Sequence, residues 1–323
     1  MTAATLPKTN PHLHLTGAMR PATLAELAAR DGLALPPPFA PGTVHEWPAF
    51  QERYDLARAA IRGPADIERV VVEAATDDAA SGAGWIELQI DPTSYAPVTG
   101  GLAGAVEAAL AGAARAPIPV GVVVAASWAA PPEHALRLAT LAAAYAGRGV
   151  VGFGLSNDER LGTVAGMVPA CRTAAEAGLL VVPHGGFYTP PAHVADCVTL
   201  LGAHRIGHGL AAMHDPATRD LLAERGVALE VCPTSYPPLG VAAITELPIR
   251  ALRAAGVPVA LGTDDPLLFG ADLATQYALV TSDPAEQADL ARCAVTTSAA
   301  PAALEEDLLR GIAAWVTRPT TPA

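Results

Sequence analysis

Histidine and aspartate residues stand at the ends of several apolar runs in this chain, where they could bind a metal ion. His12 and His14 form an H-x-H pair, and the two-residue period of a strand places both rings on one side. Single histidines follow Val-Val-Pro and Arg-Ile-Gly, and a pair of aspartates follows Leu-Gly-Thr: His184, His208, Asp264 and Asp265. Three neutral imidazoles and a carboxylate suit a divalent ion such as zinc. The sequence therefore predicts a metal centre.

The other five histidines lie in loops or beside helical patterns: His45, His134, His193, His204 and His214. Because none of them ends an apolar run, we interpret them as surface or supporting residues. His214 remains a reserve candidate, since it follows His208 closely in the sequence.

Eight apolar runs rich in β-branched residues supply the strand ends: His12–Leu15, Trp85–Asp91, Ile118–Ala126, Val150–Leu155, Leu179–His184, Arg205–His208, Val227–Cys232 and Val257–Thr263. Such continuous runs are typical of parallel strands that are buried on both faces. Helical patterns rich in Ala and Leu separate them, including Pro132–Ala146, Val164–Ala177, Ala192–Leu201 and Pro216–Arg225. This alternation predicts an α/β fold, a (β/α)8 TIM barrel, whose site lies at the carboxyl ends of the strands. A doubly wound open sheet is the structural rival, but no G-x-G-x-x-G follows the first strand.

The first crossover is much longer than an ordinary strand-to-helix unit. Residues 16–84 form a long helical insertion, which contains the Pro-rich stretch Leu35–Pro41 and aromatic residues at Trp47, Phe50 and Tyr54. One interpretation is a set of extra helices packed on the barrel, and the other is a lid over its mouth. We expect residues 1–323 to form one barrel domain.

Composition excludes several classes of partner. The chain has 323 residues with 20 Lys and Arg against 32 Asp and Glu, a formal charge of −12 and a pI near 5.1. An acidic chain without a basic tract is a poor ligand for nucleic acid or anionic membranes. Its apolar stretches are too short and interrupted for a transmembrane helix. We expect a small molecule as the partner, and homo-oligomer formation stays open.

The cysteines indicate a reducing compartment. Cys171, Cys197, Cys232 and Cys293 are scattered and form no C-x-x-C pair, so neither a zinc ribbon nor a disulfide framework is expected. The first residues lack the basic segment and apolar run of a secretory signal. We therefore expect a cytoplasmic protein.

Six ordered blocks of the sequence resemble the adenosine deaminase family of metal-dependent amidohydrolases. They are His12-Leu13-His14-Leu15-Thr16-Gly17-Ala18, residues 152–159 (GFGLSNDE), Pro183-His184-Gly185-Gly186, residues 205–209 (RIGHG), residues 229–235 (LEVCPTS) and Thr263-Asp264-Asp265-Pro266. The resemblance covers essentially the whole chain. Such ordered blocks indicate common ancestry.

The resemblance implies a zinc ion on His12, His14, His184 and Asp264, with a water in the open position. The metal would lower the pKa of that water and so create a hydroxide nucleophile. His208 matches the histidine that orients the water and stabilises developing charge, and Asp265 matches the carboxylate that hydrogen-bonds a purine ring nitrogen. The implied catalytic residues are thus His208, Asp264 and Asp265.

The only lysine of the chain limits the number of metal ions. Binuclear hydrolases of this general kind use a bridging carboxylated lysine on an interior strand, whereas Lys8 precedes the first predicted strand. We therefore expect one Zn2+ per chain.

A phenylalanine replaces the residue that the family uses as its proton donor. The family has His-x-Gly-Glu after the fifth strand, whereas this chain has His184-Gly185-Gly186-Phe187. Phenylalanine cannot transfer a proton, and general acid catalysis contributes about 10²–10⁴ in rate. Deamination of adenosine should therefore fail unless another group replaces the acid.

Three further positions depart from the family pattern in the expected substrate-binding set, which comprises His14, Thr16, Asn157, Phe187, Tyr236 and Asp265. Thr16 stands where the family has an Asp for the ribose 5′-hydroxyl, and Tyr236 where Asn usually follows Cys-Pro-Thr-Ser. Asn157 stands where a glycine often offers its backbone N–H to the base. The additional aromatic rings favour a planar or apolar substrate group.

Three functional hypotheses follow. The first is a mononuclear zinc-dependent hydrolase for a modified purine or other N-heterocycle, which attacks an electrophilic carbon without the missing glutamate. The second is an ordinary adenosine or adenine deaminase with a substitute proton donor. The third is a metal-binding pseudoenzyme that binds a purine-like ligand without turnover. The intact metal positions favour chemistry over binding alone.

Overall fold

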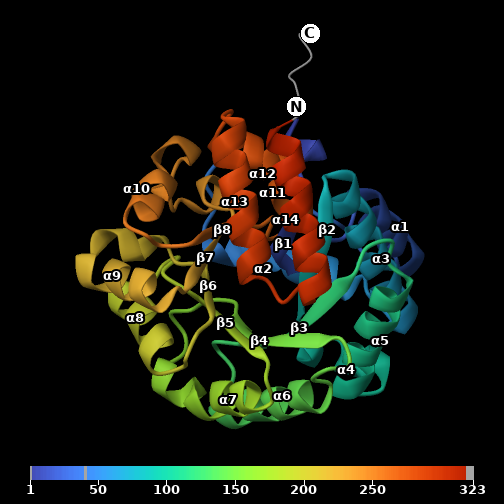
Figure 1. The fold of residues 1–323 in the computed structure, drawn as a ribbon. Helices are drawn as coiled ribbons and strands as arrows, with labels where there is room; N and C mark the ends of the chain where they lie inside the picture. The colour runs from blue at the N-terminus through green and yellow to red at the C-terminus, as the bar shows by residue number, and fades with distance from the viewer. Residues whose placement is uncertain (1, 40–41, 318–323) are drawn as a thin grey trace.

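Eight parallel strands follow one another around a barrel in the order of the sequence (Figure 1). The computed structural model describes residues 2–39 and 42–317. The strands are β1 (Lys8–His14), β2 (Ala83–Ile90), β3 (Val120–Ser127), β4 (Val150–Ser156), β5 (Leu180–Gly185), β6 (Arg205–His208), β7 (Ala228–Val231) and β8 (Val259–Leu261). A bridge between Leu13 and Asp264 joins the end of β8 to β1. The predicted TIM barrel is confirmed.

Helices surround the strands and alternate with them along the chain (Figure 1). They are α1 (Pro21–Asp31), α2 (Trp47–Ala59), α3 (Pro64–Ala80), α4 (Ala96–Thr99), α5 (Leu102–Arg115), α6 (Pro132–Ala144), α7 (Val164–Glu176), α8 (Pro191–Thr199), α9 (Pro216–Arg225), α10 (Ile249–Ala254), α11 (Pro266–Phe269), α12 (Leu273–Val280), α13 (Pro284–Thr297) and α14 (Ala302–Val316). Many begin at proline, whose fixed φ suits the first helical turn. Gly226 caps the carboxyl end of α9 with a φ of 63°, which glycine adopts readily.

The first strand begins four residues earlier than the sequence predicts. The segment Lys8–Asn10 is polar and precedes a proline, which is typical of a turn, yet it pairs with β2 and is fully buried. Asn10 Nδ2 donates to Asp78 at 2.8 Å and to Thr263 at 2.7 Å. Lys8 Nζ donates to the carbonyls of residues 3 and 6, both at 2.7 Å. These long-range and local partners satisfy polar groups that a sequence pattern assigns to solvent.

The insertion between β1 and β2 contains α1, α2 and α3. Residues 40 and 41 of the predicted insertion lie outside the described residues. Helix α3 buries Ile67, Val70 and Val71 against the core of the barrel. Phe50 of α2 stacks on Phe269 of α11, with ring centroids 5.7 Å apart. The long first crossover is therefore helical, as predicted.

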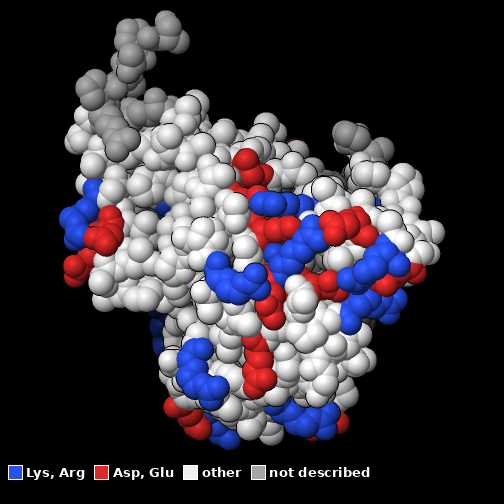
Figure 2. Space-filling model, turned by 90° about the vertical axis from the view of Figure 1, so that its right-hand side faces the viewer, with Lys and Arg blue, Asp and Glu red and all other residues white. Residues whose placement is uncertain are grey.

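Acidic and basic side chains interleave on the face formed by α1, α3 and α5 (Figure 2). The ion pairs of this face include Arg20–Asp77 at 2.6 Å and Arg69–Glu26 at 2.8 Å. No single sign of charge dominates this face, so it offers no basic platform for a polyanion. Within the described ranges, no helix combines the length and the apolar character that a membrane crossing requires.

Candidate metal centre and active-site pocket

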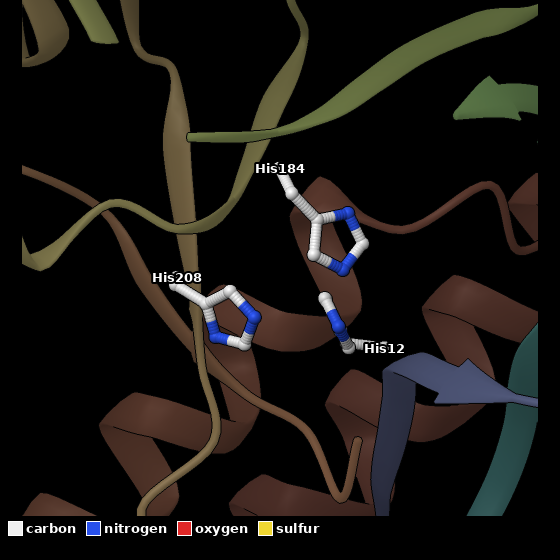
Figure 3. Close-up of side chains that lie close together, drawn as sticks. All are labelled: His12, His184 and His208. Atoms are coloured by element: carbon white, nitrogen blue, oxygen red, sulfur yellow. The ribbon is translucent and has the colours of Figure 1, made fainter. Parts of the chain in front are cut away.

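Three imidazole rings from different strands converge at the carboxyl end of the barrel (Figure 3). His12 lies near the end of β1, His184 in β5 and His208 at the end of β6. The ring centroid of His12 is 4.7 Å from that of His184 and 5.1 Å from that of His208. Pairing within the parallel sheet brings these strand ends to one edge, although the three rings are widely separated in the sequence.

His14 and Asp264 complete the predicted ligand set. His14 Nε2 lies 3.2 Å from His184 Nε2 and 3.3 Å from Asp264 Oδ1. The same carboxylate oxygen is 3.5 Å from His12 Nε2. The structure thus brings all four predicted ligands together, with their nitrogen and oxygen atoms facing one another.

The donor set fits a divalent cation. His12 Nε2 is buried and makes no hydrogen bond with any described residue, although such an atom normally has a partner. His184 Nδ1 lies 2.8 Å from the Leu155 carbonyl and can only donate to it, so Nε2 keeps its lone pair. Imidazole nitrogens with free lone pairs beside a carboxylate are what zinc binds. His12, His14, His184 and Asp264 would hold the ion.

A buried chain of charges orients His12. Its Nδ1 lies 2.7 Å from Glu230 Oε2, and Glu230 Oε1 accepts from Arg205 Nε at 2.5 Å. Arg205 also pairs with Glu87, and its Nη1 donates to the Thr297 carbonyl at 2.7 Å. We assigned no role to Glu87, Arg205 or Glu230 from the sequence. A charged residue inside an apolar strand is the signal that could have found them.

Burial and neighbouring charges set the protonation of the centre. Burial lowers the pKa of His184, and it lowers that of His208 to about 3. Burial would also lower the pKa of His12, but Asp264 and Glu230 outweigh it and raise the value to about 10. A cation at His12 Nε2 would replace that proton and would take over its charge between the two carboxylates.

Three residues of the predicted site have unusual backbone conformations. Asn157, His208 and Asp264 have φ values of 72°, 68° and 59°, and they are the non-glycine residues with positive φ in the described part of the chain. A left-handed conformation costs non-glycine residues about 1–3 kcal/mol and is often found at functional sites. All three belong to the predicted site.

An aromatic cluster surrounds His208. The Phe187 ring is 4.6 Å from the His208 ring and 5.6 Å from that of Tyr236. The Tyr236 hydroxyl accepts from the Cys232 N–H at 3.0 Å and lies 3.3 Å from His208 Nδ1. Because its own hydrogen is then free to point at Nδ1, Tyr236 can hold the tautomer of His208 that carries its proton on Nε2.

Asp265 follows the predicted metal ligand Asp264 and has an unsatisfied oxygen. Its side chain is buried, and Oδ1 has no hydrogen-bond partner among the described residues. Burial and the charge of Asp264 raise its pKa well above the ordinary value. Gly17 makes room for this carboxyl group, because a Cβ there would lie 1.8 Å from Asp265 Oδ1. A ligand could satisfy this oxygen.

A single pocket joins the centre to the helical insertion. His14, Asn157, Phe187 and Asp265 line it together with His184, His208 and Asp264, whereas Thr16 and Tyr236 do not reach its wall. Thr16 is fully buried, and its hydroxyl lies 2.5 Å from that of Tyr95, which does line the pocket. Tyr95 therefore covers the position at which the sequence predicted substrate contact.

The loop that carries Phe187 is anchored by Glu159, to which we assigned no function from the sequence. Glu159 Oε1 accepts from the backbone N–H groups of residues 187, 188 and 189 at 2.7–2.8 Å. The Thr189 hydroxyl also donates to it at 2.8 Å. Glu159 Oε2 is buried without a partner in the described part of the chain, and the residue lines the pocket. Only folding brings these residues together, since they lie 28 to 30 positions apart.

The fold and the site define a metal-dependent hydrolase: a parallel barrel that gathers imidazoles and a carboxylate at its carboxyl-terminal edge. The sequence profile of the family described as "Adenosine deaminase" matches residues 7–315. The chain belongs to the adenosine deaminase family and is a metal-dependent aminohydrolase.

Three known proteins illustrate the similarity. A Streptomyces virginiae protein with the provisional name adenosine/adenine deaminase is 48% identical over 97% of each chain. An aminodeoxyfutalosine deaminase of Acidothermus cellulolyticus is 35% identical over 98% of this chain and 94% of its own. The crystal structure of an adenine deaminase from Arthrobacter aurescens superimposes with a TM-score of 0.87 at 25% identity, covering 97% of this chain and all of that one.

Proposed function

We propose that this chain is a mononuclear zinc-dependent hydrolase that acts on a modified purine or another nitrogen heterocycle. The observation that carries this proposal is the Phe187 ring, which packs 4.6 Å from the His208 ring. Both line the pocket together with His14, His184 and Asp264 of the predicted ligand set. The ligand set can bind zinc, but the phenylalanine beside it cannot donate a proton. The substrate should therefore be more electrophilic than adenosine, or already protonated on its ring.

Each residue then has a defined part in the reaction. A bound zinc ion supplies a nucleophile near neutral pH by lowering the pKa of a coordinated water. His208, whose Nε2 lies 3.9 Å from Asp264 Oδ2, would orient the attacking water and stabilise negative charge as it develops. Asp265 Oδ1 would hydrogen-bond a ring nitrogen of the substrate and fix the heterocycle in the pocket.

Helix α2 would act as the lid. Trp47, Phe50 and Tyr54 of this helix line the pocket. A cover of aromatic rings excludes water from the site, which strengthens the electrostatic interactions within it. The insertion of residues 16–84 would thus serve the single barrel domain as a cover for its mouth.

An ordinary adenosine or adenine deaminase is the second candidate, favoured by the name of the Streptomyces virginiae relative. This function requires a substitute proton donor, and Glu159 is the acidic residue that holds the Phe187 loop. Because Oε1 already accepts four hydrogen bonds, proton transfer would have to use the unpartnered Oε2.

The test is ammonia release by the zinc-loaded protein from adenosine, adenine, 2′-deoxyadenosine and a panel of modified aminopurines. Phe187→Glu restores the acid of the family, and Phe187→Gln is the matched control without an acid. We expect the native protein and Phe187→Gln to leave the three standard substrates intact, while Phe187→Glu deaminates adenosine or adenine. At least one modified substrate should be turned over by the native protein.

Two outcomes would contradict the leading proposal. Turnover of a standard substrate by the native protein at about 1–10³ per second would favour the second candidate, and Glu159→Gln should then abolish it. Binding of purines without ammonia release from any substrate would instead indicate a pseudoenzyme. Zinc content and melting temperature of each variant exclude misfolding as the cause.

A further inference from the structure

One basic side chain lines the pocket, and the reaction described above does not use it. Arg58 lies in the last turn of α2 and is the only lysine or arginine among the described residues of the pocket wall. Its side chain is 26% exposed, so the guanidinium is only partly solvated. A half-buried charge that faces a ligand pocket is a candidate for ligand recognition.

The Arg58 guanidinium makes few contacts within the protein. Nη1 lies 3.1 Å from Asp55 Oδ1, and the group stacks over the Tyr54 ring at 4.8 Å from its centroid. The Asp55 side chain is 53% exposed, so water shares its charge. No further hydrogen bond joins the guanidinium to a residue that the structure describes. Of its five N–H donors, several are therefore left for a ligand.

The surrounding groups keep Arg58 charged. Burial lowers the pKa of Arg58, but Tyr54, Tyr95, Asp55 and Asp91 outweigh it and raise the value. Asp91 also lines the pocket, and its Oδ1 accepts from the Thr93 N–H at 2.9 Å, which commits that oxygen to the backbone.

Ser94 and Tyr95 add hydroxyl groups to the pocket wall that Arg58 lines. Tyr95 lines it, with its hydroxyl 2.5 Å from that of the buried Thr16, and Ser94 lies beside Tyr95. An aspartate at position 16, which the family pattern would supply, would repel an anion placed here. Threonine removes that charge, and the hydroxyls of Ser94 and Tyr95, which line the pocket, can donate hydrogen bonds to an anionic group.

We infer that the pocket binds a heterocyclic substrate with an anionic substituent, a carboxylate or a phosphate, which Arg58 holds through its planar guanidinium. This inference rests on the proposed function and deepens it by naming the substrate class. The heterocycle lies against Asp265 and Phe187 near the metal centre, and the anion lies at the α2 end of the pocket. Arginine suits both anions, because its N–H groups match their paired oxygens.

The test compares ligands that differ only in the anion and that cannot be deaminated. Inosine, inosine 5′-monophosphate and inosine 5′-carboxylic acid are titrated calorimetrically into the zinc-loaded native protein, Arg58→Met and Arg58→Lys. Methionine keeps the apolar stem, and lysine keeps the charge without the planar fork. Arg62→Gln is the matched control, because Arg62 lies outside the pocket wall and 3.8 Å from its acidic partner Asp31.

We expect at least one anionic ligand to bind the native protein about ten- to hundredfold more tightly than inosine, as expected for a charge-assisted bidentate pair. Arg58→Met should remove this preference, Arg58→Lys should keep part of it, and Arg62→Gln should keep it whole. Whether the phosphate or the carboxylate binds more tightly identifies the anion.

Equal affinities for inosine and both anionic ligands, a preference that survives in Arg58→Met, or failure of both anions to bind would overturn the inference. Ammonia release distinguishes this failure from that of the proposed function. A protein that deaminates neutral heterocycles without an anion preference keeps the function and loses the anion site. One that prefers the anion but releases no ammonia from any aminopurine keeps the site and loses the function.

Discussion

Replacing Arg205 by methionine should destabilise the protein strongly, because this residue neutralises two buried carboxylates. The side chains of Arg205, Glu87 and Glu230 are all at most 4% exposed. Methionine removes the charge and the hydrogen bonds to both carboxylates and to the Thr297 carbonyl. Removing one partner of a buried ion pair typically costs about 3–5 kcal/mol, since the other charge is left uncompensated.

The lowered pKa of Glu230 indicates a contribution of similar size. Burial raises its pKa, but Arg205 and His12 outweigh burial and lower the value from 4.5 to about 2. At 1.36 kcal/mol for each pKa unit, the net effect of burial, Arg205 and His12 favours the ionised form in the folded state by about 3 kcal/mol. A carboxyl group with a lowered pKa stabilises the fold above its unfolded pKa. The contribution is therefore complete above about pH 4.5 and is lost as the pH falls towards 2.

Urea unfolding followed by circular dichroism checks this prediction, at pH 7 and at several lower pH values. Arg205→Met should lose about 3–5 kcal/mol of unfolding free energy at pH 7 and should show a weaker decline of stability towards acid. Arg253→Met is the matched control, since Arg253 forms a 3.4 Å pair with Asp289 at the surface. It should lose no more than about 1 kcal/mol.

The reasoning is refuted if Arg205→Met is no less stable than Arg253→Met, or if its stability falls with decreasing pH as steeply as that of the native protein.

The affinity for zinc tests the other end of this chain of charges, because Glu230 orients His12. Competition with a chromophoric chelator should show about 10–100-fold weaker zinc binding in Glu230→Gln. Unchanged zinc affinity would mean that the contact between Glu230 and His12 does not support the metal centre.

Three other perturbations test the site. Tyr236→Phe leaves the Cys232 N–H without its buried partner, so the unfolding free energy should fall by about 1–3 kcal/mol. Because the lost hydroxyl also lies beside His208, kcat should fall more than KM rises. Unchanged values in urea unfolding and steady-state kinetics would argue against these contacts. Gly17→Ala should displace Asp265 and lower kcat/KM about a hundredfold. Gly63→Ala is the control and should leave kcat/KM unchanged, because Gly63 has an extended φ and no atom near its Cβ position. Similar rates in the two variants would contradict the close contact between Gly17 and Asp265. Removal of zinc by a chelator should lower the melting temperature measured by calorimetry. Zinc at a hundredfold excess over its Kd should restore about 2.7 kcal/mol of unfolding free energy. Equal stability with and without zinc would mean that the folded protein has no zinc site.

The strands of the barrel were predictable because burial on both faces leaves a strong local signal. Runs such as Val150–Leu155 are apolar throughout, and the structure forms β4 at Val150–Ser156. The start of the first strand was not predictable, because Asn10 is satisfied by Asp78 and Thr263, which are 68 and 253 positions away. A sequence pattern reports the character of a residue and its neighbours but not such distant partners.

The candidate site could likewise be predicted only in part. His12, His184 and Asp264 could be placed together from the sequence, since parallel strands carry their carboxyl ends to one edge of the barrel. The contacts of Thr16 could not, because its buried hydroxyl is covered by Tyr95 from a different segment.

The sequence by itself therefore determined the barrel, and it supplied the predicted metal ligands and the hypothesis that Phe187 replaces the usual acid, because strand periodicity and residue chemistry are local properties. Only the tertiary structure decided that Arg205 balances two carboxylates, that Glu159 anchors the Phe187 loop and that Arg58 faces the pocket. Those relations depend on which side chains meet after folding. They are set by the packing of helices and loops around the barrel, and a linear pattern does not encode that packing in any one segment.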